Sequence, residues 1–167
     1  MKQYLDPKPK NPKKPNKFNI KSKENQDLIN TILFIIESFG IPVDQKKSYS
    51  RKVEKMALSF LAVCGIKKID ELKECKDANT RHALTSRQII TFINESFGEK
   101  ISSGSYDDIR REDLNHLVLA DIVLKSSPES AMNDSTRGYM LNPLYADLIR
   151  NFGAGNWTEL VENQLGD

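Results

Sequence analysis

Two closely spaced helix-start signals constrain the fold of this chain more than any other feature. Residues Thr85 to Gln88 place a hydroxyl at a cap position and a glutamine three residues later, and Gly98 closes the apolar run that follows. Residues Ser105 to Asp108 form a second start, and the apolar run after it extends to Ala120. Two such helices joined by a glycine-containing turn predict a helix-turn-helix, with the second helix continuous from Ser105 onward.

Two strand-like runs follow this pair of helices. They are residues 122–124 and 138–141, and the polar, turn-rich residues 126–137 separate them. Helix, turn, helix and hairpin is the order of a winged helix-turn-helix. We therefore predict a mainly α fold, a winged helix-turn-helix with a helical N-terminal extension and a small β-hairpin as the wing.

The extension and the C-terminal part supply further helices. Apolar residues recur at helical spacing over about 25–39 and 50–64, and a short helix is expected at 69–74. Pro143 is suited to the first turn of another helix, and Trp157 opens a last amphipathic stretch. We interpret Trp157 and Tyr139 as packing residues.

The positive charge is concentrated at the N-terminus. Residues 1–24 contain eight lysines and two acidic residues, whereas the rest of the chain is net negative. Four prolines among the lysines predict an extended or disordered arm. The predicted organisation is therefore a basic Pro/Lys-rich arm (1–24) and a helical winged helix-turn-helix domain (25–167). Such an arm is typical both of polyanion binding and of a solubilising tail.

The predicted second helix and hairpin carry the candidate DNA-binding residues. A helix fits the major groove, arginine can bond guanine and asparagine can bond adenine. The helix candidates are Tyr106, Asp107, Asp108, Arg110, Arg111 and Asn115; the wing candidates are Lys125, Ser130, Asn133, Ser135, Thr136 and Arg137; the arm candidates are Lys13, Lys14 and Lys17.

A structural role competes with base recognition at some of these positions. Arg110 falls near the inner stripe with Leu114 and Leu117, where it could pair with Asp113 or another acid. Asp107 would repel phosphates, although it suits the positive end of a helix dipole. The order of the predicted elements alone leaves both DNA binding and protein interaction open, since winged helices serve both purposes.

Residues 103–123 and 132–157 resemble the N-terminal helix-turn-helix domain of BsuBI/PstI-type restriction endonucleases. The run from Met56 to Ile66 resembles an earlier helix of that family. Asp121 departs from the pattern, which has glycine at the start of the wing. The matching positions are Ser105, Ile109, Arg110, Arg111, Leu114, Ala120, Ile122, Val123, Asn133, Tyr139, Gly153 and Trp157.

The resemblance implies double-stranded DNA binding in restriction-modification, without catalysis by this chain. Mg²⁺-dependent cleavage would belong to a separate C-terminal nuclease domain, and no cofactor is expected here. The chain would be the N-terminal part of such an enzyme or a free-standing relative. A transcriptional controller and a protein-interaction module remain alternatives. A palindromic target would imply a homodimer, which the sequence leaves open.

Other classes find little support. Asp44, Glu71 and Lys73 match the residue types of a small nuclease motif. However, no strand is predicted around them, and short motifs match by accident. His82 and His116 have no cysteine or histidine spacing that suits zinc. No run is apolar enough for a membrane span, and Cys64 and Cys75 suggest no disulfide framework. We expect a cytoplasmic protein with no membrane partner.

Overall fold

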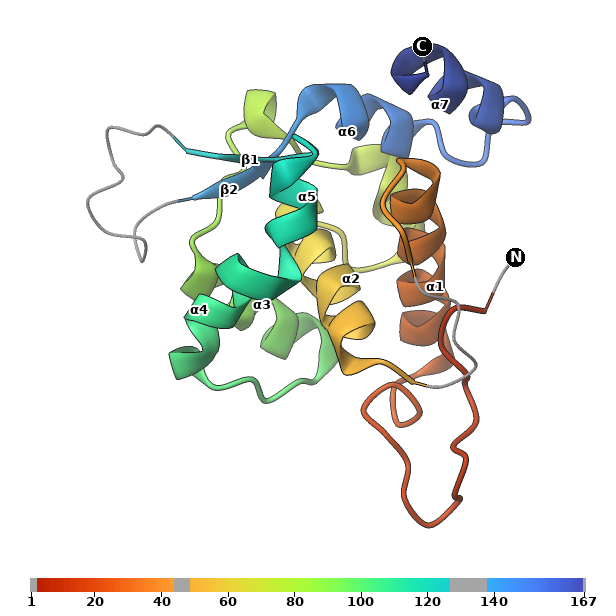
Figure 1. The fold of residues 1–167 in the computed structure, drawn as a ribbon, viewed down its shortest axis with the longest axis vertical. Coiled ribbons are helices and arrows are strands. Elements are labelled where there is room, and N and C mark those ends of the chain that lie inside the picture. Colours follow the sequence, from red (N-terminus) through yellow and green to blue (C-terminus); the bar gives the residue numbers. More distant parts are fainter. Residues whose placement is uncertain (1–2, 44–48, 127–137, 167) are drawn as a thin grey trace.

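The computed structural model of the chain describes residues 3–43, 49–126 and 138–166. Its helices surround α2 (Arg51–Cys64), which packs against α1 (Lys23–Ser38), α3 (Ser86–Phe97), the segment that follows α3, and the hairpin (Figure 1). Every residue of α2 from Met56 to Cys64 is buried, because this part of the helix is covered on all sides. The predicted mainly α fold is confirmed.

The helix boundaries follow local capping chemistry. Ser22 caps α1, and Ser50 accepts a hydrogen bond from the backbone N–H of Val53 at the start of α2. Gly65 ends α2 with φ of 70°, a left-handed conformation that glycine adopts without a Cβ clash. Two short 3₁₀ helices, η1 (Ile69–Glu74) and η2 (Ala78–Thr80), then lead to α3.

The prediction of one continuous helix from Ser105 onward is wrong. A 3₁₀ turn, η3 (Ser103–Ser105), leads into one helical turn, α4 (Tyr106–Asp108); a π-helical turn, η4 (Ile109–Asp113), follows, and α5 (Asn115–Leu119) ends the segment. Ile109 and Leu114 are both fully buried, yet they are five residues apart, which a 3.6-residue period cannot place on one stripe. The N–H of Leu114 donates to the carbonyl of Ile109, and this wider turn brings both side chains to the core.

The predicted hairpin is present at its base. Strands β1 (Val123–Lys125) and β2 (Tyr139–Leu141) are antiparallel, with Leu124 opposite Met140. Leu84 forms an isolated bridge with the buried Tyr139, so the hairpin is joined to the residue that precedes α3. Asp121, which precedes the hairpin, has φ of 60°, and this explains why a glycine suits the position.

Two helices close the C-terminal side. They are α6 (Pro143–Arg150), capped by Asn142, and α7 (Trp157–Leu165). Buried Trp157 lies against Phe34 and Phe152, and its indole N–H donates to the carbonyl of Leu148 at 2.7 Å. The interpretation of Trp157 as a packing residue is confirmed, and these rings fasten the C-terminal helices to α1.

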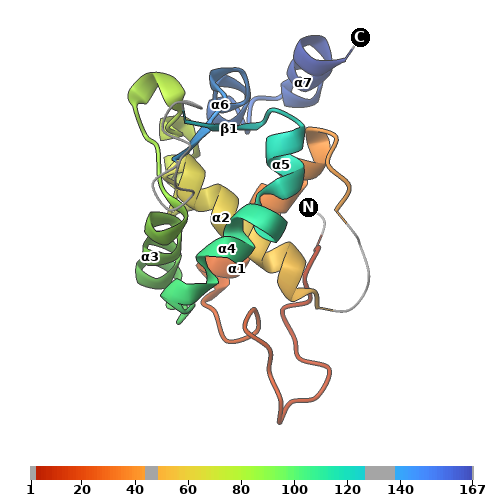
Figure 2. The ribbon, with the colours of Figure 1, turned by 60° about the vertical axis from the view of Figure 1, so that its left-hand side comes forward.

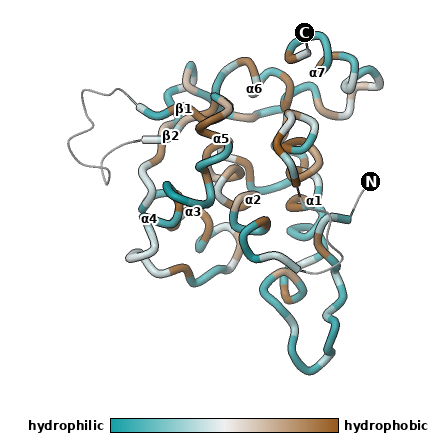
Figure 3. Tube along the Cα trace, viewed as in Figure 1, coloured by the Kyte–Doolittle hydropathy of each residue, from teal (hydrophilic) through white to brown (hydrophobic). Residues whose placement is uncertain are grey.

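Residues 3–22 differ from the expected extended or disordered arm. They contain no helix or strand, but Tyr4, Leu5 and Phe18 are buried in the core. The side-chain oxygen of Asn30 in α1 accepts hydrogen bonds from the backbone N–H groups of Tyr4 and Leu5 at 2.8 and 3.1 Å. Figure 3 shows the polar loop of this segment projecting from the more apolar helices. The apolar residues of the arm therefore belong to the folded body.

No helix within the described ranges combines the length and apolarity that crossing a bilayer would require.

Candidate nucleic-acid interface

The second half of the helix-turn-helix lies beside α3 at one face of the molecule (Figure 2). Thr85 and Gln88 form the predicted capping box, with hydrogen bonds of 3.2 and 2.9 Å between each side chain and the other residue's backbone N–H. Gly98 ends α3 with φ of 66°. Asn94 then holds the turn, since its amide group both donates to and accepts from the backbone of Ile101. The segment from Tyr106 to Leu119, here called the recognition segment, is thereby fixed against α3.

Arg110 and Arg111 share one carboxylate, and these three residues form what we call the surface cluster. Arg110 Nη2 lies 2.7 Å from Asp107 Oδ1, and Arg111 Nε lies 3.2 Å from Asp107 Oδ2. The hydrogen bond from Arg110 and the charge of both arginines hold the pKa of Asp107 below its usual range. The side chain of Arg111 is 68% exposed, that of Arg110 only 29%. Arg110 therefore has an ion-pair partner, as the structural alternative expected, but the partner is Asp107.

Tyr106 contacts a residue that the sequence did not single out. The guanidinium carbon of Arg87, in the first turn of α3, lies 4.8 Å from the centroid of the Tyr106 ring. This cation–π contact leaves Tyr106 half-buried between the two helices. Arg87 therefore places a guanidinium against Tyr106, the residue that precedes Asp107 of the surface cluster.

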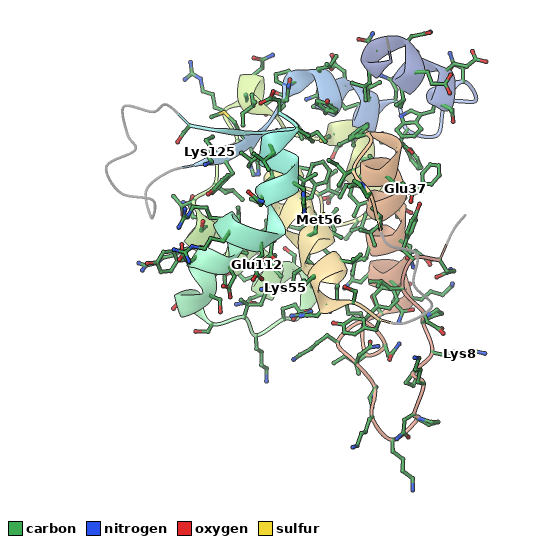
Figure 4. The ribbon with its side chains drawn as sticks, viewed as in Figure 1. Lys8, Glu37, Lys55, Met56, Glu112 and Lys125 are labelled. Atoms are coloured by element: carbon green, nitrogen blue, oxygen red, sulfur yellow. The ribbon has the colours of Figure 1, made fainter. Side chains whose placement is uncertain are left out.

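The remaining candidates of the recognition segment are accessible. Asp108, Asn115 and His116 are exposed, and Lys125 extends from β1 (Figure 4). Asp108 carries a negative charge at this face, so it does not favour phosphate contact. The wing candidates Ser130, Asn133, Ser135, Thr136 and Arg137 lie outside the described residues.

A buried carboxyl group lies between the π turn and α2. Asp113 is 4% exposed, and its Oδ2 lies 3.5 Å from Lys55 Nζ. Burial raises the pKa of Asp113 to about 6, against the opposing charge of Lys55. Beside the pair is a groove of about 370 Å³ whose lining includes Met56, Glu112 and His116, and Figure 4 shows Lys55, Met56 and Glu112 in this region.

The arm lysines occupy a separate surface. Lys13, Lys14 and Lys17 are exposed, as are Lys8 and Lys10. No ion pair of these five side chains is found in the described part of the chain. They are therefore available to an anionic partner.

The structure leaves the grouping considered for a nuclease site untested. Glu71 lies in η1 and accepts a hydrogen bond from the backbone N–H of Lys67, while Asp44 lies outside the described residues. The ring of His82 contacts the carbonyl of Ala62 at 3.0 Å. Among the described residues, no three His, Cys, Asp or Glu side chains gather to hold a metal ion.

Comparisons with known proteins agree with this arrangement of elements. The family model of the BsuBI/PstI restriction endonuclease HTH domain matches residues 26–166. The chain belongs to this family. A solved structure of the SdaI restriction endonuclease superposes with a TM-score of 0.65 at 18% sequence identity, over 83% of this chain and 41% of that one. The chain thus spans less than half of that protein, and the likeness shows the fold. A search of curated proteins found no match.

Several residues of this BsuBI/PstI-type domain were missed by sequence reasoning. Arg87 stands inside the capping-box sequence but was not considered as a site residue. Asp113 was considered only as a partner of Arg110, and its pairing with Lys55 was not predicted. Neither Lys55 nor Asn94 gave a signal, because both act through contacts between elements.

Proposed function

We propose that this chain binds double-stranded DNA, with the recognition segment in the major groove and the β1–β2 hairpin as a wing. The surface cluster carries the proposal: two arginines are displayed in the early turns of the helix that follows α3, where a helix-turn-helix domain contacts bases. Membership of a restriction endonuclease HTH-domain family supports the same partner.

Within this proposal the candidates have different tasks. Arg111 and Asn115 are exposed and would contact base edges, Tyr106 and Arg110 would shape that surface, and Lys125 would contact phosphate. We also propose phosphate contacts for the residues predicted at the tip of the wing, which are Ser130, Asn133, Ser135, Thr136 and Arg137.

We further propose that the domain serves a type II restriction endonuclease or a free-standing relative, and that it is not itself catalytic. Mg²⁺ would be needed only by a nuclease domain. A homodimer would form if the target is palindromic.

The test is fluorescence anisotropy of a labelled random-sequence duplex with the native chain and with Arg110→Ala plus Arg111→Ala. We expect several-fold weaker binding, because a good arginine–base contact is worth about 1–3 kcal/mol. Lys68→Ala plus Lys73→Ala, at two exposed lysines of the η1 region, is the control and should bind normally. Equal affinity of all three proteins would remove the recognition segment from the interface. Absence of duplex binding together with co-purification of a protein would favour the protein-interaction alternative.

A further inference from the structure

The lysine-rich part of the arm is a closed loop. The side chain of Asn19 donates to the carbonyl of Asp6 at 2.8 Å, which joins the two ends of residues 6–19, here called the basic loop. Asn16 and Asn19 exchange hydrogen bonds between side chain and backbone N–H at 3.1 and 2.8 Å. Tyr4 and Leu5, just before the loop, are buried, and Phe18, next to its closing residue Asn19, is buried as well. Its geometry is that of an Ω-loop, which does not behave as a free tail.

A buried cluster fixes the end of this loop to the helices that hold the recognition segment. Lys21 Nζ lies 3.2 Å from Glu54 in α2 and also pairs with Glu99, just after α3. Arg51 Nη2 approaches the same Glu99 at 2.7 Å. The side chains of Lys21, Glu54 and Glu99 are at most 5% exposed. We call Lys21, Arg51, Glu54 and Glu99 the buried cluster.

The buried cluster carries a cost in desolvation free energy, and a tail that only increased solubility would not require such a cluster. Lys21, Glu54 and Glu99 lose nearly all of their water in the buried cluster, whereas Arg51 reaches it from the surface with 31% of its side chain exposed. The loss is compensated only when the buried groups remain paired. The structure uses them to connect the arm with α2 and α3, which both pack against the recognition segment. The basic loop is therefore held in a set orientation relative to that segment.

Resting on the function proposed above, we infer that the basic loop is a preorganised clamp for the phosphate backbone of the duplex whose groove the recognition segment enters. Five exposed lysines lie on a loop whose one acid, Asp6, is engaged by the backbone N–H of Lys8. In Figures 1 and 2 the loop projects beyond the end of the molecule at which α4 lies. A duplex that crosses the recognition segment would meet the loop on one flank.

The charge of the loop is tested through salt dependence. Each phosphate contact contributes about 0.9 to the slope of log affinity against log salt concentration. We expect Lys13→Gln plus Lys14→Gln to reduce the slope by about 2, if both side chains contact phosphate. The control, Lys68→Gln plus Lys73→Gln, removes the same charge from the η1 region and should leave the slope unchanged. Equal slopes for the two variants would overturn the inference.

A test of the fixed orientation of the loop requires a substitution that leaves the charge of the loop unchanged. Asn19→Ala opens the base of the loop but keeps every lysine and the buried cluster. We expect about threefold weaker binding at constant salt, because the loop must then be ordered on binding. Circular dichroism would verify that the fold is retained, and faster amide exchange at residues 8–17 would verify that the loop has opened. Unchanged affinity with an opened loop would show that preorganisation has no role.

These results separate the loop from the proposed function. If Arg110→Ala plus Arg111→Ala weakens binding while both loop variants bind normally, the clamp is wrong and the groove-binding segment stands. If the loop variants weaken binding and the arginine variant does not, the clamp stands and the recognition segment is wrong. If the native chain binds no duplex, both fail. A truncation at Asn25 is unsuitable for these tests, since it removes buried Phe18 and the Lys21 partner of Glu54.

Discussion

The buried cluster and the surface cluster use the same side-chain chemistry in opposite surroundings. In the buried cluster, Glu99 is 2% exposed as a side chain and is shared by Lys21 and Arg51. In the surface cluster, Asp107 is 40% exposed and is shared by Arg110 and Arg111. One carboxylate with two cations therefore appears twice, once with the carboxylate buried and once with it exposed to water.

The difference in solvent decides what each cluster can do. A buried ion whose partner is lost remains desolvated and unpaired, so the buried cluster holds the arm and two helices in one arrangement. An exposed ion can exchange its partner for water or for a ligand at little cost. The surface cluster therefore keeps its arginines available to a ligand, as the proposed DNA contact requires, and the following predictions test this division.

The largest expected effect is on stability. Glu99→Ala leaves Lys21 and Arg51 with Glu54 as their one shared carboxylate, so that two cations face a single acid. We expect it to lower the free energy of unfolding by about 3–5 kcal/mol. Urea unfolding followed by circular dichroism measures the change. Asp107→Ala, the matched change in the surface cluster, should leave the unfolding midpoint where it was. Equal losses in the two variants would contradict the division between the clusters.

Two buried carboxyl groups should respond to pH in opposite directions. Burial alone would raise the pKa of Glu99, but hydrogen bonds from Arg51 and Lys21 lower it, so its stabilising contribution is present above the unfolded pKa and disappears in acid. Burial raises the pKa of Asp113 to about 6 from its ordinary value of 3.8, so the folded state is penalised above pH 6 and relieved as the pH falls toward 4.

The variant Asp113→Asn isolates the second effect. It should be more stable than the native chain at pH 7 by up to about 3 kcal/mol, and this advantage should disappear near pH 4. Chemical unfolding at both pH values measures it. An advantage that is independent of pH would show that the carboxyl group titrates normally. His116 lines the neighbouring groove, so His116→Gln serves as a control for a side-chain change beside Asp113.

A smaller effect is expected from Asp107→Asn on DNA binding. Removing one negative charge should raise affinity for random-sequence duplex by roughly two- to fivefold at low salt. The arginines would also lose the carboxylate that orients them, so a pool of duplexes selected from a random library should be less restricted in sequence. Anisotropy and selection measure the two outcomes. Lower affinity for random duplex would mean that Asp107 supports binding in some other way.

The smallest effect is expected at the edge of the surface cluster. Arg87→Ala removes the cation–π contact with Tyr106 and should lower stability by about 0.5–1 kcal/mol. Thermal unfolding detects such a change. Lys67→Ala, which removes a longer contact of 5.6 Å to the ring of Phe92, gives the comparison. A loss as large as that of Glu99→Ala would place Arg87 among the groups that hold the fold.

Local signals were enough to predict most of the elements. Capping by Thr85, the stop at Gly98 and the position of Pro143 all depend on neighbours in the sequence, and the structure has helices with these boundaries. The family resemblance likewise depended on a pattern along the chain, and it is confirmed. The glycine expected where Asp121 stands is explained by its positive φ.

What could not be predicted depends on contacts between distant residues. Lysine and proline content alone gave no reason to expect that Lys21 would be buried between Glu54 and Glu99, which are 33 and 78 positions away. The π turn had a signal in the five-residue spacing of Ile109 and Leu114, but an interrupted helix and a poorly packed one have the same spacing. The partner of Arg110 was uncertain for the same reason, since Asp107 and Asp113 lie three residues before and three residues after it.

The π turn has a consequence for how this domain can vary. A π turn holds one residue more than an α-helical turn, so it acts as a phase shift of about 100° between the side chains before it and those after it. Deleting one residue between Ile109 and Leu114 would restore an ordinary helix, and it would rotate Asn115 and His116 away from their present direction. A single residue thus sets the rotation of α5 relative to α4. The length of the π turn therefore decides which side chains of the recognition segment point in the same direction.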